Sequence, residues 1–128
     1  MIRQTLTILL VLFGLSNLAF AFFSVWDLTG TAKLTGFAMI TRGGYGEFRA
    51  VYTGLVAAVG ALLVLSPFRP EGRAWLQTLC FIFAGLACGR ILSLALDGSD
   101  PQTVLGLIFE GAAAAATFEG SRRIHAAR

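Results

Sequence analysis

The sequence predicts an all-α fold in the form of a four-helix transmembrane bundle. Apolar residues make up 56% of the 128 residues and charged residues only 13%, whereas soluble domains are about 25% charged. The mean hydropathy is +0.76. The apolar residues also gather in blocks whose length approaches the roughly 20 residues that cross a bilayer as a helix. We therefore expect a single integral membrane domain over residues 1–128.

The blocks define four expected spans and a basic tail. In chain order these are residues 4–23, 48–66, 75–96 and 102–118, followed by the tail at 119–128. The fourth span is the weakest because Glu110 and a run of alanines dilute its hydrophobicity, and we expect the other spans to assist its insertion. Hydropathy alone also allows a three-span protein.

The first span also has some features of a signal peptide. Arg3 provides a short positive region, and Ala19-Phe20-Ala21 resembles a cleavage site of small residues. However, the apolar stretch continues through Phe22 and Phe23, which makes it longer than a typical signal-peptide core. We expect a retained span.

Two of the three connections are short polar turns. The segment PFRPEGRA at 67–74 contains two prolines and a glycine, which favour a turn. The segment DGSDP at 97–101 predicts a second turn, in which Asp100 caps the following helix and Pro101 takes its first position.

The first connection, residues 24–47, is much longer, and loops of this length are often functional or have structure of their own. Within it, KLTGFAMI (33–40) predicts a short interfacial helix or a hairpin. RGGYG (42–46) predicts a flexible segment or a tight turn.

The arginines predict the orientation. With the N-terminus inside the cell, the cytoplasmic side receives Arg3, Arg69, Arg73, Arg122, Arg123 and Arg128. The outer side receives Lys33 and Arg42, with Arg49 at the boundary. This asymmetry follows the positive-inside bias of short loops. We expect a multi-pass protein of the cytoplasmic (inner) membrane with both termini in the cytoplasm and the long first connection outside.

All four expected spans carry a polar side chain at a similar depth. Asn17, Arg90 and Glu110 lie roughly 9–12 Å below the outer ends of their helices at 1.5 Å per residue, and Tyr52 with Thr53 lies slightly shallower. Ionisable groups inside a span are costly and are often functional. The sequence therefore predicts a polar layer in the outer half of the membrane.

Arg90 and Glu110 are the expected ion pair, because a guanidinium can bind a carboxylate with two parallel hydrogen bonds. Asp97 follows Arg90 by seven residues and so lies on nearly the same helix face. Glu47 and Arg49 stand at the outer start of the second span. Such charges can line a small pocket, or the pair can simply fix the packing of the bundle.

The remaining features favour packing. Gly85 and Gly89 form a GxxxG spacing, and Gly54 and Gly60 notch the second span, so we expect close helix contacts at these glycines. Cys80 and Cys88 lie eight residues apart, too far along one helix for a disulfide. His125 in the tail is expected to be solvated, and the tail itself to approach anionic headgroups.

Three segments resemble a known family: GEFRAVYTGLVAAVG at the start of the second span, GRILSLALDG at the end of the third, and Glu110 in the fourth. They resemble the bacterial four-helix membrane family catalogued as domain of unknown function 4345, over residues 5–118. The resemblance implies that the characteristic positions here are Arg49, Arg90 with Ser93, Asp97 with Gly98, and Glu110. Thr53 stands where this family would have a glycine. The resemblance implies a fold but no reaction.

We expect a non-enzymatic protein whose polar layer organises the bundle or binds a small apolar or amphipathic ligand. Two alternatives stay open. The first is a small-molecule transporter, although the first span has Asn17 where small multidrug transporters have a glutamate. The second is an intramembrane enzyme that acts on a lipid or quinone-like substrate through Glu110. No cofactor, metal or nucleic acid is expected. The expected partner is the lipid bilayer, and a homodimer or a membrane partner protein also fits the sequence. The candidate residues are Asn17, Glu47, Arg49, Tyr52, Arg90, Ser93, Asp97 and Glu110.

Overall fold

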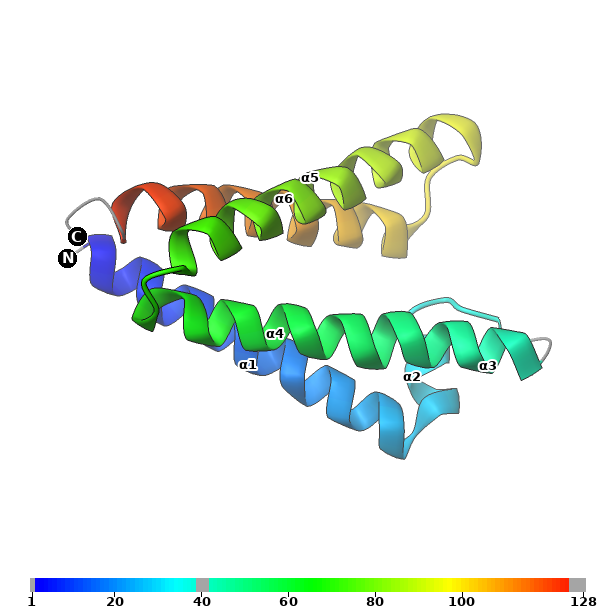
Figure 1. Cartoon of the computed structure of the whole chain (residues 1–128). Coiled ribbons are helices and arrows are strands. Elements are labelled where there is room, and N and C mark those ends of the chain that lie inside the picture. Colours follow the sequence, from blue (N-terminus) through cyan, green and yellow to red (C-terminus); the bar gives the residue numbers. More distant parts are fainter. Residues whose placement is uncertain (1, 39–41, 125–128) are drawn as a thin grey trace. The chain divides into compact units, whose positions relative to one another are not determined.

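The computed structural model describes residues 2–38 and 42–124, and this part of the chain is helical with short turns and no strand. The helices are α1 (Ile2–Trp26), α2 (Leu28–Leu34), α3 (Arg42–Phe48), the π-helix η1 (Arg49–Leu55), α4 (Val56–Leu65), the 3₁₀ turn η2 (Ser66–Phe68), α5 (Gly72–Leu96) and α6 (Pro101–Arg123). Figure 1 shows their course along the chain. The predicted all-α class is confirmed.

Three helical stretches are long and apolar enough to cross a membrane: Ile2–Trp26, Arg42–Phe68 and Gly72–Leu96. Each contains one of the first three predicted spans and extends beyond it at one end or both. α6 has 23 residues, but Glu110 and its alanines lower its hydropathy, and it is not among these three in the part of the chain described. The fourth span stays a prediction.

Helix α3 corrects one expectation. RGGYG was expected to be flexible or a tight turn, yet Arg42–Phe48 is helical and continues without a break through η1 into α4. Glycine weakens a helix by about 1 kcal/mol per residue, but extending an existing helix costs far less than nucleating one. The long apolar helix that follows explains why this segment is helical.

The rest of the long first connection begins with α2. Asp27 caps this helix by accepting a hydrogen bond from the backbone N–H of Gly30 at 2.9 Å. Gly36 then turns the chain with φ 70°, a conformation that glycine adopts at little cost. The interfacial helix or hairpin expected at 33–40 extends to Met39 and Ile40, which lie outside the described residues, as does His125.

The chain forms two compact units, Met1–Leu10 with Leu65–Arg128, and Val11–Val64. In the first unit, α5 and α6 form an antiparallel hairpin (Figure 1), closed by the predicted turn, where Gly98 has φ 91°. The start of α1 packs on this hairpin at Gly120, where an added Cβ would lie 2.9 Å from Leu10 Cδ1 and 3.2 Å from Leu76 Cδ1.

In the second unit, α1 and α4 approach until their backbones touch. A Cβ added at Gly60 would lie 2.8 Å from the carbonyl oxygen of Gly14, and a Cβ added at Gly14 would lie 2.8 Å from that of Gly60. The close contact expected at Gly60 is therefore present, whereas the one expected at Gly54 is not, since an added Cβ there would meet only the Arg49 carbonyl oxygen of the same helix, at 3.7 Å. The one expected at Gly85 and Gly89 is wrong, since a Cβ at either position would meet no atom within 4 Å.

Candidate functional site

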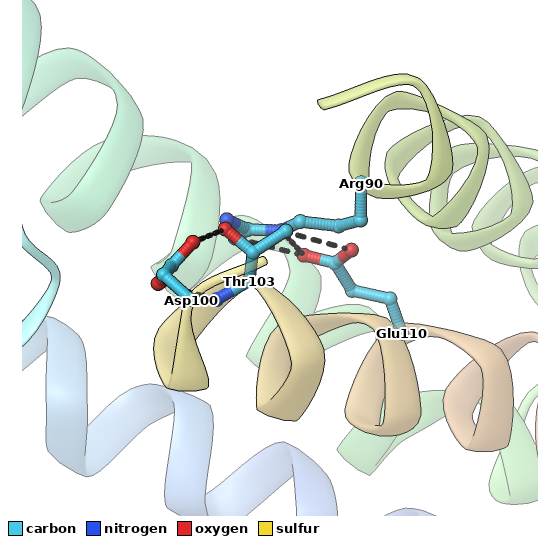
Figure 2. A network of polar contacts seen from close by, with 4 residues as sticks. All are labelled: Arg90, Asp100, Thr103 and Glu110. Carbon is cyan, nitrogen blue, oxygen red and sulfur yellow. Dashed lines mark hydrogen bonds and ion pairs between the residues drawn. The ribbon is translucent and has the colours of Figure 1, made fainter. Parts of the chain in front are cut away.

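Arg90 and Glu110 meet across the α5–α6 hairpin of the first unit. Arg90 Nη2 lies 3.2 Å from Glu110 Oε1, and Nε donates to Oε1 at 3.3 Å and to Oε2 at 3.4 Å. Figure 2 shows the two side chains reaching toward each other from their helices. The guanidinium thus presents two nitrogens to one carboxylate, and these two contacts fix the orientation of the guanidinium as well as its distance from the carboxylate.

The two partners differ in exposure. The Glu110 side chain is 14% exposed, whereas the Arg90 side chain is 41% exposed. The carboxylate therefore lies within the hairpin and the arginine closes over it from the outside. Removing the arginine would leave a largely buried carboxylate without its counter-charge, which is the costly case for a buried ion pair.

Gly106 makes room for this arrangement. A Cβ added at Gly106 would lie 2.9 Å from Arg90 Nε, 3.0 Å from Cζ and 3.2 Å from Nη2. Real Cβ atoms do not approach neighbours this closely without displacing them. Arg90 therefore lies flat against α6 at a position that only glycine leaves open, one turn before Glu110.

Asp100 lies at the start of α6, beside Thr103. Its carboxylate accepts hydrogen bonds from the backbone N–H groups of Gln102 at 2.9 Å and Thr103 at 3.0 Å, and from the Thr103 hydroxyl. Together with Pro101 at the first helical position, this is the predicted cap. The Thr103 hydroxyl, the Thr103 and Gln102 amides and the more distant charge of Arg90 lower the pKa of Asp100.

Ser93 and Asp97 form a second polar contact on α5. Ser93 Oγ donates to Asp97 Oδ2 at 3.0 Å in an exposed position, and Asp97 ends the helix. Among the described residues, the ion pairs join Arg90 to Glu110, and Arg122 and Arg123 to Glu119. Asp97 and Arg90 share a helix face without bonding to each other.

The other candidates lie in the second unit. The Asn17 side chain donates to the carbonyl of Phe13 in its own helix at 2.8 Å. The ring of Tyr52 stacks on Phe48 with centroids 4.5 Å apart, and Phe20 and Phe37 flank it at 6.4 Å and 6.1 Å. The structure therefore assigns Tyr52 to an aromatic cluster. That all these polar groups share one layer stays a prediction.

Part of the GEFRAVYTGLVAAVG segment in the second predicted span forms an unusual helix. Arg49, Tyr52 and Thr53 all lie in the π-helix Arg49–Leu55, a geometry that is rare and often found at functional sites. Glu47 is the last residue but one of α3 and is exposed, as is Arg49.

Two polar contacts were missed by the sequence-based prediction. Ser24 is fully buried, and its hydroxyl lies 2.6 Å from Thr53 Oγ1, which joins α1 to η1. Ser24 stands one residue beyond the predicted end of the first span, and a lone serine there gives no signal. The contact of the Thr103 hydroxyl with Asp100 was missed because a single threonine within the predicted fourth span gives no signal either.

Metal binding finds no support in the described residues, where no three His, Cys, Asp or Glu side chains are grouped to hold an ion. Cys80 and Cys88 are both free. The chemistry that the site offers is a fixed guanidinium–carboxylate pair beside a capped helix start.

The family model described as a domain of unknown function (DUF4345) matches residues 5–118. The chain belongs to this family. No curated protein and no solved structure matches the chain. The DUF4345 match includes every candidate residue from Asn17 to Glu110 and leaves Arg3, Arg122 and Arg123 outside it. The family description assigns no activity, so the function must be argued from the site itself.

Proposed function

We propose that this DUF4345 protein is a non-enzymatic, multi-pass protein of the bacterial cytoplasmic membrane. In this proposal α1, the Arg42–Phe68 helix, α5 and α6 are four spans, and both termini are cytoplasmic. The Arg90–Glu110 pair joins α5 to α6 inside the membrane. The observation that carries the proposal is the ion pair itself, because it explains how α6 can insert despite Glu110.

The distribution of polar and apolar side chains supports membrane embedding. Large apolar residues are widely exposed, such as Trp26 at 83%, Phe81 at 79% and Leu96 at 74%. In contrast, Ser24, Ser66 and Thr117 are fully buried. Soluble domains rarely expose large contiguous apolar patches, whereas helices in membranes pack through small and hydroxyl residues and expose apolar side chains to lipid.

The length of α6 is compatible with a span. Its 23 residues extend over roughly 34 Å at 1.5 Å per residue, which exceeds the hydrocarbon thickness of about 30 Å. Arg90 lies six residues before the end of α5, so its Cα is roughly 9 Å below that end. An ionised carboxylate at such depth is expensive alone and much less so when paired.

A second function is favoured by the exposure of Arg90. The guanidinium has five N–H donors, the bonds to Glu110 use Nε and Nη2, and the side chain is 41% exposed. A small amphipathic ligand with an acceptor oxygen could therefore bind Arg90 without breaking the pair. Transport and catalysis through Glu110 stay hypotheses.

A double-mutant cycle in detergent-solubilised protein tests the pair. We expect Arg90→Gln and Glu110→Gln each to lower thermal stability, with a coupling energy of roughly 1 kcal/mol. The charge swap Arg90→Glu with Glu110→Arg should recover part of the loss. The matched control is the exposed pair Arg123–Glu119 on α6, for which exposed-pair values of at most about 0.5 kcal/mol are expected.

A coupling energy near zero and no recovery in the swapped protein would contradict the structural pair. The ligand-binding candidate predicts something different: a thermal shift of the wild-type protein with extracted membrane lipids that Arg90→Gln abolishes. A wild-type protein that shows no such shift would leave the architectural role as the sole function of Arg90.

A further inference from the structure

A basic cavity lies at the end of the first unit where α1 begins and α6 ends. Its volume is about 520 Å³, and the described residues that line it are Ile2, Arg3, Arg122 and Arg123. Figure 1 shows the first turn of α1 and the last turns of α6 at the same end of the first unit. Residues from the two ends of the chain thus form one site.

The cavity carries an excess of positive charge. Glu119 accepts a hydrogen bond from Arg123 Nε at 2.5 Å, and its carboxylate lies 3.7 Å from Arg122 Nη1. Three guanidinium groups against one ionised carboxylate leave two positive charges in excess. Arg122 and Arg123 stay accessible, with side chains 63% and 51% exposed.

Two of the three arginines, Arg122 and Arg123, are held in place by neighbouring side chains. Glu119 fixes Arg123, and the guanidinium carbon of Arg122 lies 5.5 Å from the centre of the Phe118 ring. The packing of Leu10 against Gly120 keeps α1 beside α6. The cavity lies at the positive N-terminal end of α1 and at the negative C-terminal end of α6, so the two helix dipoles oppose each other there and the arginines supply the positive field.

We propose that this cavity binds the headgroup phosphate of an anionic phospholipid. The inference rests on the proposed function, because only a membrane-spanning α1 and α6 place Arg3 and Arg122 at headgroup level. Arginine forks match phosphate oxygens with paired hydrogen bonds, and basic pockets between helices on the cytoplasmic side suit anionic headgroups. Ile2 adds an apolar wall beside the phosphate, which suits a lipid better than a free anion.

The arginines of the cavity lie outside the residues that the family model matches. The DUF4345 match covers residues 5–118, so Arg3, Arg122 and Arg123 all lie outside it. The lipid site is therefore separate from the Arg90–Glu110 pair, because Arg122 and Arg123 lie at the end of α6, twelve or more residues after Glu110. It can be removed without touching the candidate residues on α5 and α6.

Native mass spectrometry of the full-length protein in non-ionic detergent tests the proposal with two lipids, phosphatidylglycerol and phosphatidylcholine. We expect phosphatidylglycerol to bind about tenfold more tightly than phosphatidylcholine, and Arg3→Gln with Arg122→Gln to weaken it by about tenfold. This double variant keeps the Arg123–Glu119 contact. The matched control is Arg69→Gln with Arg73→Gln, which removes one charge from the connection before α5 and one from the first turn of α5, and should change binding by less than about twofold.

Four outcomes would overturn the lipid site: equal binding of both lipids, unchanged binding by the double variant, an equal loss in the control, or displacement of the lipid by millimolar inorganic phosphate. Resistance of the wild-type protein to alkaline extraction from membranes is scored in parallel. Protein that resists extraction but shows any of these outcomes overturns the lipid site alone. Protein that alkali extracts overturns the membrane-spanning proposal.

Discussion

At the scale of single residues, Arg90 reaches Glu110 by lying across Gly106 of α6. A Cβ added at Gly106 would lie 2.9 Å from Arg90 Nε, whereas a Cβ added at Gly111, five residues further along the same helix, would meet no atom within 4 Å. Two glycines of one helix therefore have different roles. One leaves space for a charged side chain, and the other faces open surroundings.

This difference gives a prediction with a built-in control. Gly111→Ala should be neutral or stabilising, because alanine is the better helix former. Gly106→Ala gains the same propensity but displaces the guanidinium, so it should be less stable than Gly111→Ala by roughly 1 kcal/mol. Thermal unfolding of both variants in one detergent measures the difference. Equal stabilities would show that Arg90 does not depend on Gly106.

The sequence indicated some of these residues and not others. Arg90 and Glu110 stand out because each interrupts an apolar block, and a charge in such a block needs a partner. Gly106 and Ser24 could not be found this way, since their roles depend on how closely a neighbouring side chain or helix approaches. Asp100 was found because a cap is a local pattern of residue types around a helix start.

At the scale of helices, each of the first three predicted spans lies within a helix that is long and apolar enough to cross a membrane and that is longer than predicted. The helical N-terminal part of Arg42–Phe68 was not predicted, because its RGGYG segment has low helix propensity. The π-helix Arg49–Leu55 was missed because its i→i+5 bonding has no local signature in residue types. The Gly85–Gly89 spacing shows the opposite error, since a common motif does not establish a contact.

The crossing of α1 and α4 gives the prediction at this scale. A Cβ at Gly60 would meet the backbone of Gly14 and Leu18 within 3.0 Å, whereas at Gly54 the nearest atom would be 3.7 Å away. Backbone cannot yield as a side chain does, so Gly60→Ala should destabilise the protein by about 1–3 kcal/mol. Gly54→Ala is the control and should not. Thermal unfolding that ranks the two variants equally would contradict the close crossing.

At the scale of the whole molecule, the proposed four-span topology requires that α6 crosses the membrane. The other long helices are apolar enough to cross a membrane, while α6 depends on its partner α5 to shelter Glu110. If α6 crosses, the turn at 97–100 and the end of α6 lie on opposite sides. The positive-inside bias then places Arg122 and Arg123 in the cytoplasm.

Cysteine labelling in intact cells tests this most directly. Single cysteines are placed by Glu71→Cys, Ser99→Cys and Arg122→Cys, all at exposed positions, in a background with Cys80→Ala and Cys88→Ala. A membrane-impermeant reagent should label the cysteine at 99 from outside, and those at 71 and 122 only after the cells are opened. Labelling of both 99 and 122 from outside, or of neither, would show that α6 does not cross and would contradict the four-span account.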